Sequence, residues 1–223
     1  MSGILFVISG PSGAGKGSIC AGLPLDGIAE ISVSMTTRQP RPGEIEGKSY
    51  YFVSREAFHA KIEQDGFYEY AEVYGEYYGT PKAPVIERLA ADKDVILEID
   101  TQGAKQIKDT CPDGVLIFIL PPSFSELRKR IERRGSESPE KIEHRLSKVQ
   151  SEIAMIPRYD YCVVNQKLTT AIRDVRAIMR AEHIMRLGQL TQMIGLYDKK
   201  DMRRACALRV AENAAVIADW LAD

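Results

Sequence analysis

A glycine-rich segment near the N-terminus has the residue types and spacing of a loop that binds phosphate. It reads Gly10-Pro11-Ser12-Gly13-Ala14-Gly15-Lys16 and directly follows an apolar run at residues 4–8. Glycines let the backbone turn so that successive N–H groups point at one phosphate, and a helix starting after the loop adds its positive dipole end. Lys16 would bring a full charge to a phosphoryl group. The spacing G-x-x-x-x-G-K therefore predicts a phosphate-binding loop, the P-loop; a plain turn with a surface lysine is the alternative.

The residues after the lysine depart from the usual pattern. Gly17 stands where a Ser or Thr normally contacts Mg²⁺, and Ser18 follows it. The missing hydroxyl weakens a switch-GTPase interpretation more than a nucleotide-kinase one. Adenylate kinases resemble the chain at this point, since they too have a Gly after the loop lysine.

The composition limits the class of protein and its partners. The chain has 223 residues, 44% hydrophobic and 27% charged, which suits one large domain or one domain with insertions. The formal charge of -1 creates no overall field that would attract nucleic acid or an anionic membrane. No apolar run approaches the roughly 20 residues of a membrane-spanning helix, and no basic residue precedes Lys16 as in a signal peptide. We expect a cytoplasmic protein with neither nucleic acid nor membrane as a partner.

The cysteines and histidines are scattered along the chain. They form no C-x-x-C pair and no His/Cys group with the spacing of zinc ligands. We expect reduced thiols and no structural zinc. The residues concerned are Cys20, Cys111, Cys162, Cys206, His59, His144 and His183.

The P-loop must be carried by a sheet, and four short apolar runs predict its strands. They lie at residues 4–8, 95–97, 115–120 and 162–164. Continuous apolar runs suit strands that are covered on both faces, as in a parallel sheet. Helical patterns separate them, so the sequence predicts an α/β fold.

Two helices are predicted between the third and fourth strands. Ser123 and Glu126 have the spacing of a capping box, which starts a helix that should run to about Arg134 and stop at Gly135. A second helix, capped by Ser138, would run to Pro157. Its apolar stripe consists of Ile142, Leu146, Val149 and Ile153.

Several ordered motifs beside the P-loop resemble guanylate kinase, and the match runs from about residue 3 to residue 190. They are SVSMTTRQPRPGE at 32–44, GKSYYF at 47–52, FYEYA at 67–71, YYG at 77–79 and IDTQGA at 99–104. The resemblance implies a parallel-sheet P-loop NTPase core with a GMP-binding β-rich insertion and a helical lid. The implied guanylate kinase-like domain is 1–189, with its core at 1–30, 83–122 and 160–189, the insertion at 31–82 and the lid at 123–159.

Residues 190–223 form a C-terminal extension predicted to be helical. Apolar residues fall on one face of that helix, at Met202, Cys206, Val210, Ile217 and Leu221. A single helix cannot bury such a stripe alone. Either it folds back on its own core, or it packs on a second subunit to give a homo-oligomer, which is the alternative we adopt.

The resemblance implies which side chains hold GMP. Arg38 and Arg41 would grip its phosphate with the hydroxyls of Tyr50 and Tyr78, since guanidinium forks suit phosphate oxygens. A solvated arginine loop is the alternative.

The resemblance also implies a set of base contacts. Glu69 would read guanine by accepting from the ring N1–H and the exocyclic amino group, and Ser34 would donate to O6. Thr80 and Glu98 replace the usual Ser and Asp with the same hydroxyl and charge. Without the resemblance, polar residues at strand ends would be the simpler interpretation.

On the donor side, the resemblance implies contacts to ATP, to Mg²⁺ and to the moving phosphoryl group. Asp100, after the second predicted strand, would hold Mg²⁺ directly or through water, although a strand-end acid is more often a helix cap. The lid arginines would neutralise developing charge: Arg130, Arg134 and Arg145. ATP would contact Gly10, Pro11, Ser12, Gly13, Ala14, Gly15, Lys16, Gly17, Ser18 and Asn165. Gln166 replaces an Asp that is usual after Asn165.

These features together indicate an enzyme that transfers the γ-phosphoryl group of ATP to GMP in purine nucleotide metabolism, with Mg²⁺ and without a covalent protein intermediate. One alternative is a guanylate-kinase-like module that has lost catalysis and binds phosphopeptides. Another is a sister kinase for a phosphorylated sugar, which would not need Glu69 and Ser34.

Overall fold

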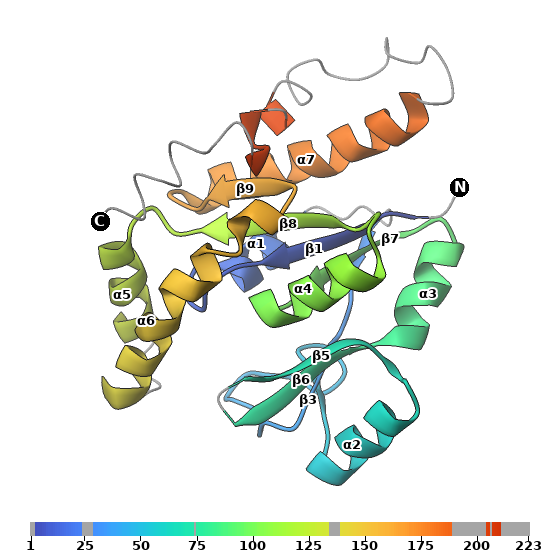
Figure 1. The fold of residues 1–223 in the computed structure, drawn as a ribbon, viewed down its shortest axis with the longest axis vertical. Coiled ribbons are helices and arrows are strands. Elements are labelled where there is room, and N and C mark those ends of the chain that lie inside the picture. The colour runs from blue at the N-terminus through green and yellow to red at the C-terminus, as the bar shows by residue number, and fades with distance from the viewer. Residues whose placement is uncertain are drawn as a thin grey trace. The chain divides into compact units, whose positions relative to one another are not determined.

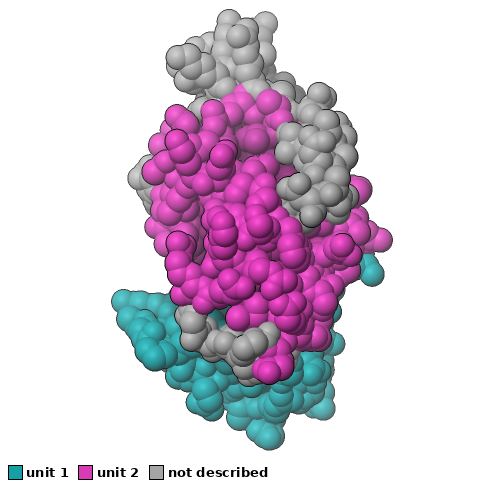
Figure 2. Space-filling model, turned by 90° about the vertical axis from the view of Figure 1, so that its left-hand side faces the viewer, with its two compact units in different colours: residues 1–7, 25–114 teal, residues 8–24, 115–223 magenta. Residues whose placement is uncertain are grey.

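The computed structural model describes residues 3–23, 29–73, 75–133, 139–188, 204–205 and 207–210. The chain divides into two compact units (Figure 2): residues 1–7 with 25–114, and residues 8–24 with 115–223. Helices and strands alternate along it (Figure 1), so the predicted α/β fold is confirmed. No described helix is both long and apolar enough to cross a membrane.

Strand β1 (Leu5–Ser9) runs from the first unit into the second. The other elements of the first unit are β2 (Ala29–Ile31), β3 (Met35–Thr36), β4 (Tyr51–Phe52), α2 (Arg55–Glu63), β5 (Phe67–Val73), β6 (Glu76–Pro81), α3 (Lys82–Ala90), β7 (Asp94–Glu98) and α4 (Thr101–Thr110). The second unit contains α1 (Lys16–Gly22), β8 (Val115–Leu120), α5 (Phe124–Arg133), α6 (Pro139–Ile153), the 3₁₀ helix η1 (Ile156–Arg158), β9 (Tyr161–Val164) and α7 (Leu168–Gly188).

Within the described residues, the core sheet has five strands in the order β2-β7-β1-β8-β9. The β2–β7 and β8–β9 pairs are parallel. All five residues of β1 and all six of β8 are buried, which explains why both strands read as unbroken apolar runs. The four strands predicted from such runs are confirmed.

The β-rich insertion forms its own four-stranded sheet, in the order β4-β3-β6-β5. Helix α2 begins at a Ser54 cap, whose Oγ accepts the Ala57 N–H at 3.2 Å. Its Phe58 is fully buried and stacks on Phe67 and Tyr77, with ring centroids 4.4 and 5.4 Å away. This aromatic cluster is the core of the small sheet.

The two helices predicted after β8 are α5 and α6. Ser123 Oγ accepts the Glu126 N–H at 3.2 Å, which is half of the predicted capping box. Leu146, Val149 and Ile153 are buried, so the predicted stripe on α6 is confirmed at these positions. The predicted stop at Gly135 and the Ser138 cap lie outside the described residues.

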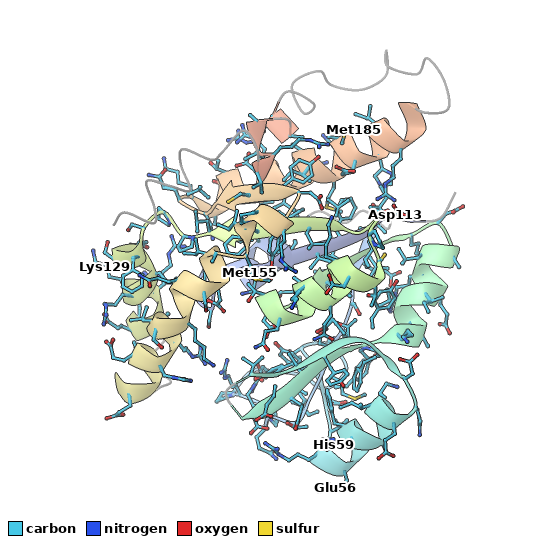
Figure 3. The ribbon with its side chains drawn as sticks, viewed as in Figure 1. Glu56, His59, Asp113, Lys129, Met155 and Met185 are labelled. Atoms are coloured by element: carbon cyan, nitrogen blue, oxygen red, sulfur yellow. The ribbon has the colours of Figure 1, made fainter. Side chains whose placement is uncertain are left out.

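Part of the C-terminal extension packs on its own chain. The Cys162 N–H of β9 donates to Leu208 O at 2.9 Å, and the Val210 N–H donates to Asp160 O at 3.2 Å. Arg209 Nη2 lies 3.4 Å from the Sδ atom of Met185. Figure 3 labels Met185 on α7. Ala205 is buried in a short helical turn, and the chain leaves the helix at residues 208–209, where residue 209 bridges to Tyr161 of β9. The predicted helix is therefore interrupted at residues 208–209, where backbone groups bond to the chain at β9 instead of within a helix. The remaining stripe positions lie outside the described residues.

Candidate active site

The P-loop lies between β1 and α1, as the sequence predicts. Gly10, Gly13 and Gly15 have φ angles of 136°, 91° and 96°, a region that glycine enters at little cost. Lys16 Nζ donates to Gly10 O at 2.6 Å and Pro11 O at 3.1 Å, so its ammonium group lies over the loop. Gly17 and Ser18 are exposed in the first turn of α1. The loop therefore has the backbone conformation and the charge that phosphate binding requires.

Three predicted residues of the second unit form contacts around this loop. Arg145 of α6 donates to Ser12 Oγ at 2.7 Å. Asn165, which is 5% exposed after β9, donates from Nδ2 to Ala14 O at 2.8 Å. Arg130 of α5 donates to the Asn165 carbonyl at 3.0 Å. These contacts bring two of the lid arginines to the loop region, while Arg134 lies outside the described residues.

A second cluster of predicted residues lies in the first unit, at the small sheet. Arg38 donates from Nε to Tyr78 Oη at 3.2 Å, and its guanidinium carbon lies 5.5 Å from the centroid of the Tyr50 ring. Burial, reinforced by the negative charge of Glu98, raises the pKa of Tyr50 to about 12, so its hydroxyl stays a proton donor at neutral pH. Arg41 is exposed and Glu98 half-buried. The Arg38 guanidinium group, the Tyr78 hydroxyl and the Tyr50 ring thus lie close together, and such a group of donors suits a phosphate.

The Glu69 carboxylate is buried in the same unit. It is 4% exposed, and its Oε1 accepts the Thr80 hydroxyl at 2.6 Å. Glu69 and Thr80 are partners in the β5–β6 ladder, next to a bulge between Phe67 and Glu69. Burial raises the pKa of Glu69 to about 7, the charge of Asp100 acts in the same direction, and the Thr80 bond opposes both. Two carboxylate oxygens offer about four acceptor sites, more than Thr80 uses, so Glu69 can accept further hydrogen bonds from a ligand.

Asp100 and Ser34 take positions at element ends. Asp100 caps α4, since its Oδ1 accepts the Gly103 N–H at 2.8 Å. Ser34 lies half-buried just before β3, and its carbonyl accepts the Tyr51 N–H at 2.9 Å. The helix-cap interpretation of Asp100 is thus confirmed, and its role toward a metal stays a prediction.

Two carboxylates outside the predicted set hold the predicted arginines. Glu44 accepts Arg38 Nη2 at 2.9 and 3.0 Å through its two oxygens, and also accepts the Arg41 N–H at 2.7 Å. Glu126 accepts Arg130 Nε at 2.9 Å. The sequence contained a sign of each pairing. Glu44 is the acid inside the arginine-rich motif, and Glu126 precedes Arg130 by four residues on α5, a spacing that favours an ion pair.

The chain has an α/β fold with a parallel sheet and a P-loop that carries a lysine. Two arginines lie near this loop. These features define a P-loop nucleotide-binding protein of the kinase class. The guanylate kinase family model matches residues 2–182. A guanylate kinase of Clostridium tetani is 53% identical over 180 residues, covering 81% of this chain and 86% of that protein. One from Thermus thermophilus is 48% identical over 202 residues, covering 91% of each. The crystal structure of guanylate kinase from Anaplasma phagocytophilum is similar with a TM-score of 0.65 and 32% identity, covering 86% and 88% of the two chains. The chain belongs to the guanylate kinase family.

Proposed function

We propose that the chain transfers the γ-phosphoryl group of ATP to GMP, giving ADP and GDP. The observation that carries the choice of acceptor is the Glu69 carboxylate, which is buried at 4% exposure and accepts the Thr80 hydroxyl at 2.6 Å. Family membership, with about half of the residues identical over most of the chain, supports the same activity.

The acceptor half of the reaction would use the residues of the first unit. The Glu69 carboxylate would accept the N1–H and exocyclic amino group of guanine, a pair of donors that adenine does not offer. Arg38, Tyr50 and Tyr78 would bind the phosphate of GMP, with Arg38 exchanging its Glu44 partner for phosphate oxygens. Ser34, Thr80, Glu98 and Arg41 complete the proposed contacts.

The donor half would use the residues of the second unit. The N–H groups of the loop and Lys16 would hold the β- and γ-phosphates of ATP. Arg130 and Arg145, with Arg134, would neutralise charge that develops on the phosphoryl group. Asn165, already bonded to Ala14 O, keeps the loop in shape beside the proposed adenine contact. Transfer in line between two oxygens needs positioning and charge neutralisation, and no nucleophilic side chain.

The residues present fit Mg²⁺ that is bound mainly by nucleotide oxygens and water. Among the described residues, no group of three or more His, Cys, Asp or Glu side chains is close enough to hold an ion. Mg²⁺ commonly keeps several waters and takes one or two carboxylates beside substrate phosphates. Asp100 is the residue we propose to hold it, through water. When bound, the ion would neutralise phosphate charge.

Different residues separate this function from its two rivals. A kinase for a phosphorylated sugar would gain nothing from the buried Glu69 carboxylate, although burial disfavours its charged form and raises its pKa to about 7. A phosphopeptide-binding module needs neither Lys16 over the loop nor Arg145 bonded to it.

An ADP-release assay with GMP, AMP and ribose 5-phosphate tests the proposal. We expect turnover with GMP and little with the other two acceptors. Turnover with ribose 5-phosphate alone would support the sugar kinase. A protein that binds GMP but releases no ADP would support the binding module.

The cellular setting and the assembly belong to the same proposal. We place the enzyme in the cytoplasm and in purine nucleotide metabolism, where its substrates occur. We assign residues 31–82 to GMP binding, 123–159 to a lid, and the part of the 190–223 extension beyond residue 210 to a homo-oligomer contact.

A further inference from the structure

Helix α4 contains a glycine, Gly103, at a position where the backbone conformation would allow any residue. Gly103 lies in the first turn, is buried, and is not among the described glycines with positive φ. A glycine inside a helix is about 1 kcal/mol less favourable than alanine. The reason for Gly103 must therefore lie in what it faces.

Gly103 faces the carboxylate of Glu69. A Cβ atom added at Gly103 would lie 2.9 Å from Glu69 Cδ, closer still to Oε2, and 3.3 Å from Ile99 Cδ1. Real Cβ atoms essentially never come within 3.0 Å of such a neighbour. On its other side the carboxylate already bonds Thr80 at 2.6 Å, so it has no room to retreat in that direction. The carboxylate fills the space between Thr80 and the bare backbone of α4.

Further hydrogen bonds fix α4 at this distance from β5. Gln106, almost one turn after Gly103, accepts the Tyr70 N–H at 3.2 Å and donates to Tyr70 O at 2.6 Å. Tyr70 is the residue after Glu69. The Asp100 cap holds the Gly103 N–H at 2.8 Å. The helix therefore cannot move away from the strand to admit a side chain without breaking the Gln106 bonds.

We propose that Gly103 is a positioning residue for base selectivity: its lack of a side chain lets Glu69 lie where it reads the two guanine donors, and Gln106 holds the helix and the strand at the required separation. The inference rests on the proposed function through the role of Glu69.

The variant Gly103→Ala tests it by steady-state kinetics. The new methyl group displaces the carboxylate, so KM for GMP should rise about tenfold or more and the GMP-over-AMP ratio should fall. KM for ATP and kcat at saturating GMP should change by less than about twofold. The control is Lys105→Ala on the exposed face of the same helix, which should leave every constant unchanged. An unchanged KM for GMP in Gly103→Ala would overturn the proposal.

A second variant separates positioning from a general packing role. Glu69→Asp withdraws the carboxylate by about one C–C bond, ~1.5 Å. In a double-mutant cycle, Gly103→Ala should then cost less in the Glu69→Asp background than alone. Additive losses would mean that Gly103 does not act through Glu69.

Thermal melting covers the case in which Gly103→Ala does not fold. The double variant Gly103→Ala/Glu69→Ala lacks the carboxylate that the new methyl group would clash with, so it should restore a cooperative unfolding transition. If the double variant also fails to fold, the glycine serves the fold alone and the proposal is wrong. Calorimetric titration of GMP into the unaltered protein and Gly103→Ala gives the same comparison without turnover. Equal binding by both proteins overturns this inference, whereas a protein that binds GMP and releases no ADP overturns only the proposed function.

Discussion

The Glu69 carboxyl has opposite effects on stability and on ligand binding. Burial raises its pKa from 4.5 to about 7. A group whose pKa is raised by folding stabilises the fold below the unfolded pKa, and this contribution disappears as the pH rises through the folded pKa. The ionised form is nonetheless the one that accepts both guanine donors. The site therefore keeps a charge that the fold alone would disfavour.

Replacing Glu69 by Gln should raise stability at high pH. The amide keeps an oxygen for the Thr80 hydroxyl and has no charge to desolvate. We expect a gain in the free energy of unfolding of about 2–3 kcal/mol at pH 8, which shrinks to near zero at pH 4.5. Urea unfolding of both proteins across this range measures it. A gain that is independent of pH would mean that Glu69 ionises as an ordinary exposed carboxyl.

The same substitution should erode base selectivity. Gln offers guanine one acceptor in place of two and turns an N–H₂ group toward one of its donors. Sites that satisfy substrate hydrogen bonds reject analogues by roughly 10⁴ to 10⁵, so a large part of this ratio should be lost. The ratio of kcat/KM for GMP and AMP measures the effect. Should the preference survive unaltered, Glu69 is not the base reader.

Lys16 should act in the transition state more than in binding. Its ammonium group lies 2.6 Å from Gly10 O and would move onto phosphate oxygens whose charge grows during transfer. Lys16→Ala should lower kcat by about a hundredfold or more and leave GMP affinity largely intact. Turnover assays with calorimetric titration of GMP check both halves. Near-normal turnover would contradict the catalytic assignment.

At the scale of single elements, Asp100 joins a structural role to a proposed catalytic one. Its cap on α4 can be separated from its charge, because Asn is about as good an N-cap as Asp whereas Ala lowers stability by about 1 kcal/mol. We expect Asp100→Asn to keep the melting temperature and lose turnover. Asp100→Ala should lose both. An Asn variant with normal turnover at low Mg²⁺ would reduce Asp100 to a helix cap.

The helices and strands could be predicted from the sequence more readily than the side-chain contacts between them. Strands β1 and β8 read as apolar runs because both faces are covered, and Ser123 marks the start of α5 by local chemistry. For the pairing of Arg38 with Glu44 the sequence offered only the presence of an acid in the same motif, and it did not show that the two side chains meet. The contact of Gly103 with Glu69 joins residues 34 apart in sequence and depends on the register of β5 against α4, which no local pattern encodes.

At the scale of the whole molecule, the tail completes the edge of the core sheet. Strand β9 is last in the sheet order, and residue 209 bridges to Tyr161. Arg204 forms an ion pair with Asp174, which is 6% exposed on α7. The Tyr161 hydroxyl donates to Glu182 at 2.6 Å, and the Arg209 guanidinium lies 5.4 Å from the Tyr161 ring centroid. These contacts favour the fold-back alternative for the described part of the tail.

Ending the chain at Gln189 should therefore lower stability while sparing catalysis. Asp174 would lose Arg204, and the edge of β9 would lose its backbone partners. We expect a fall in melting temperature on the order of 5 °C. All proposed site residues precede the cut, so kinase activity should remain measurable at 25 °C. Arg204→Ala in the full-length chain is the matched control and should reproduce part of the loss.

The full-length chain and the chain that ends at Gln189 also test self-association. The residues beyond 210 include Ile217, Trp220 and Leu221, and an apolar set of this kind suits a contact between copies. We expect light scattering to show a dimer or larger species for the full-length protein at micromolar concentration and a shift toward monomer after the cut. In the shortened protein the edge of β9 would be unpaired, and this would promote association instead of reducing it, because exposed strand edges pair with other chains. A full-length protein that is already monomeric, or a shortened one that grows in mass, would contradict the oligomer contact and leave edge protection as the role of the tail.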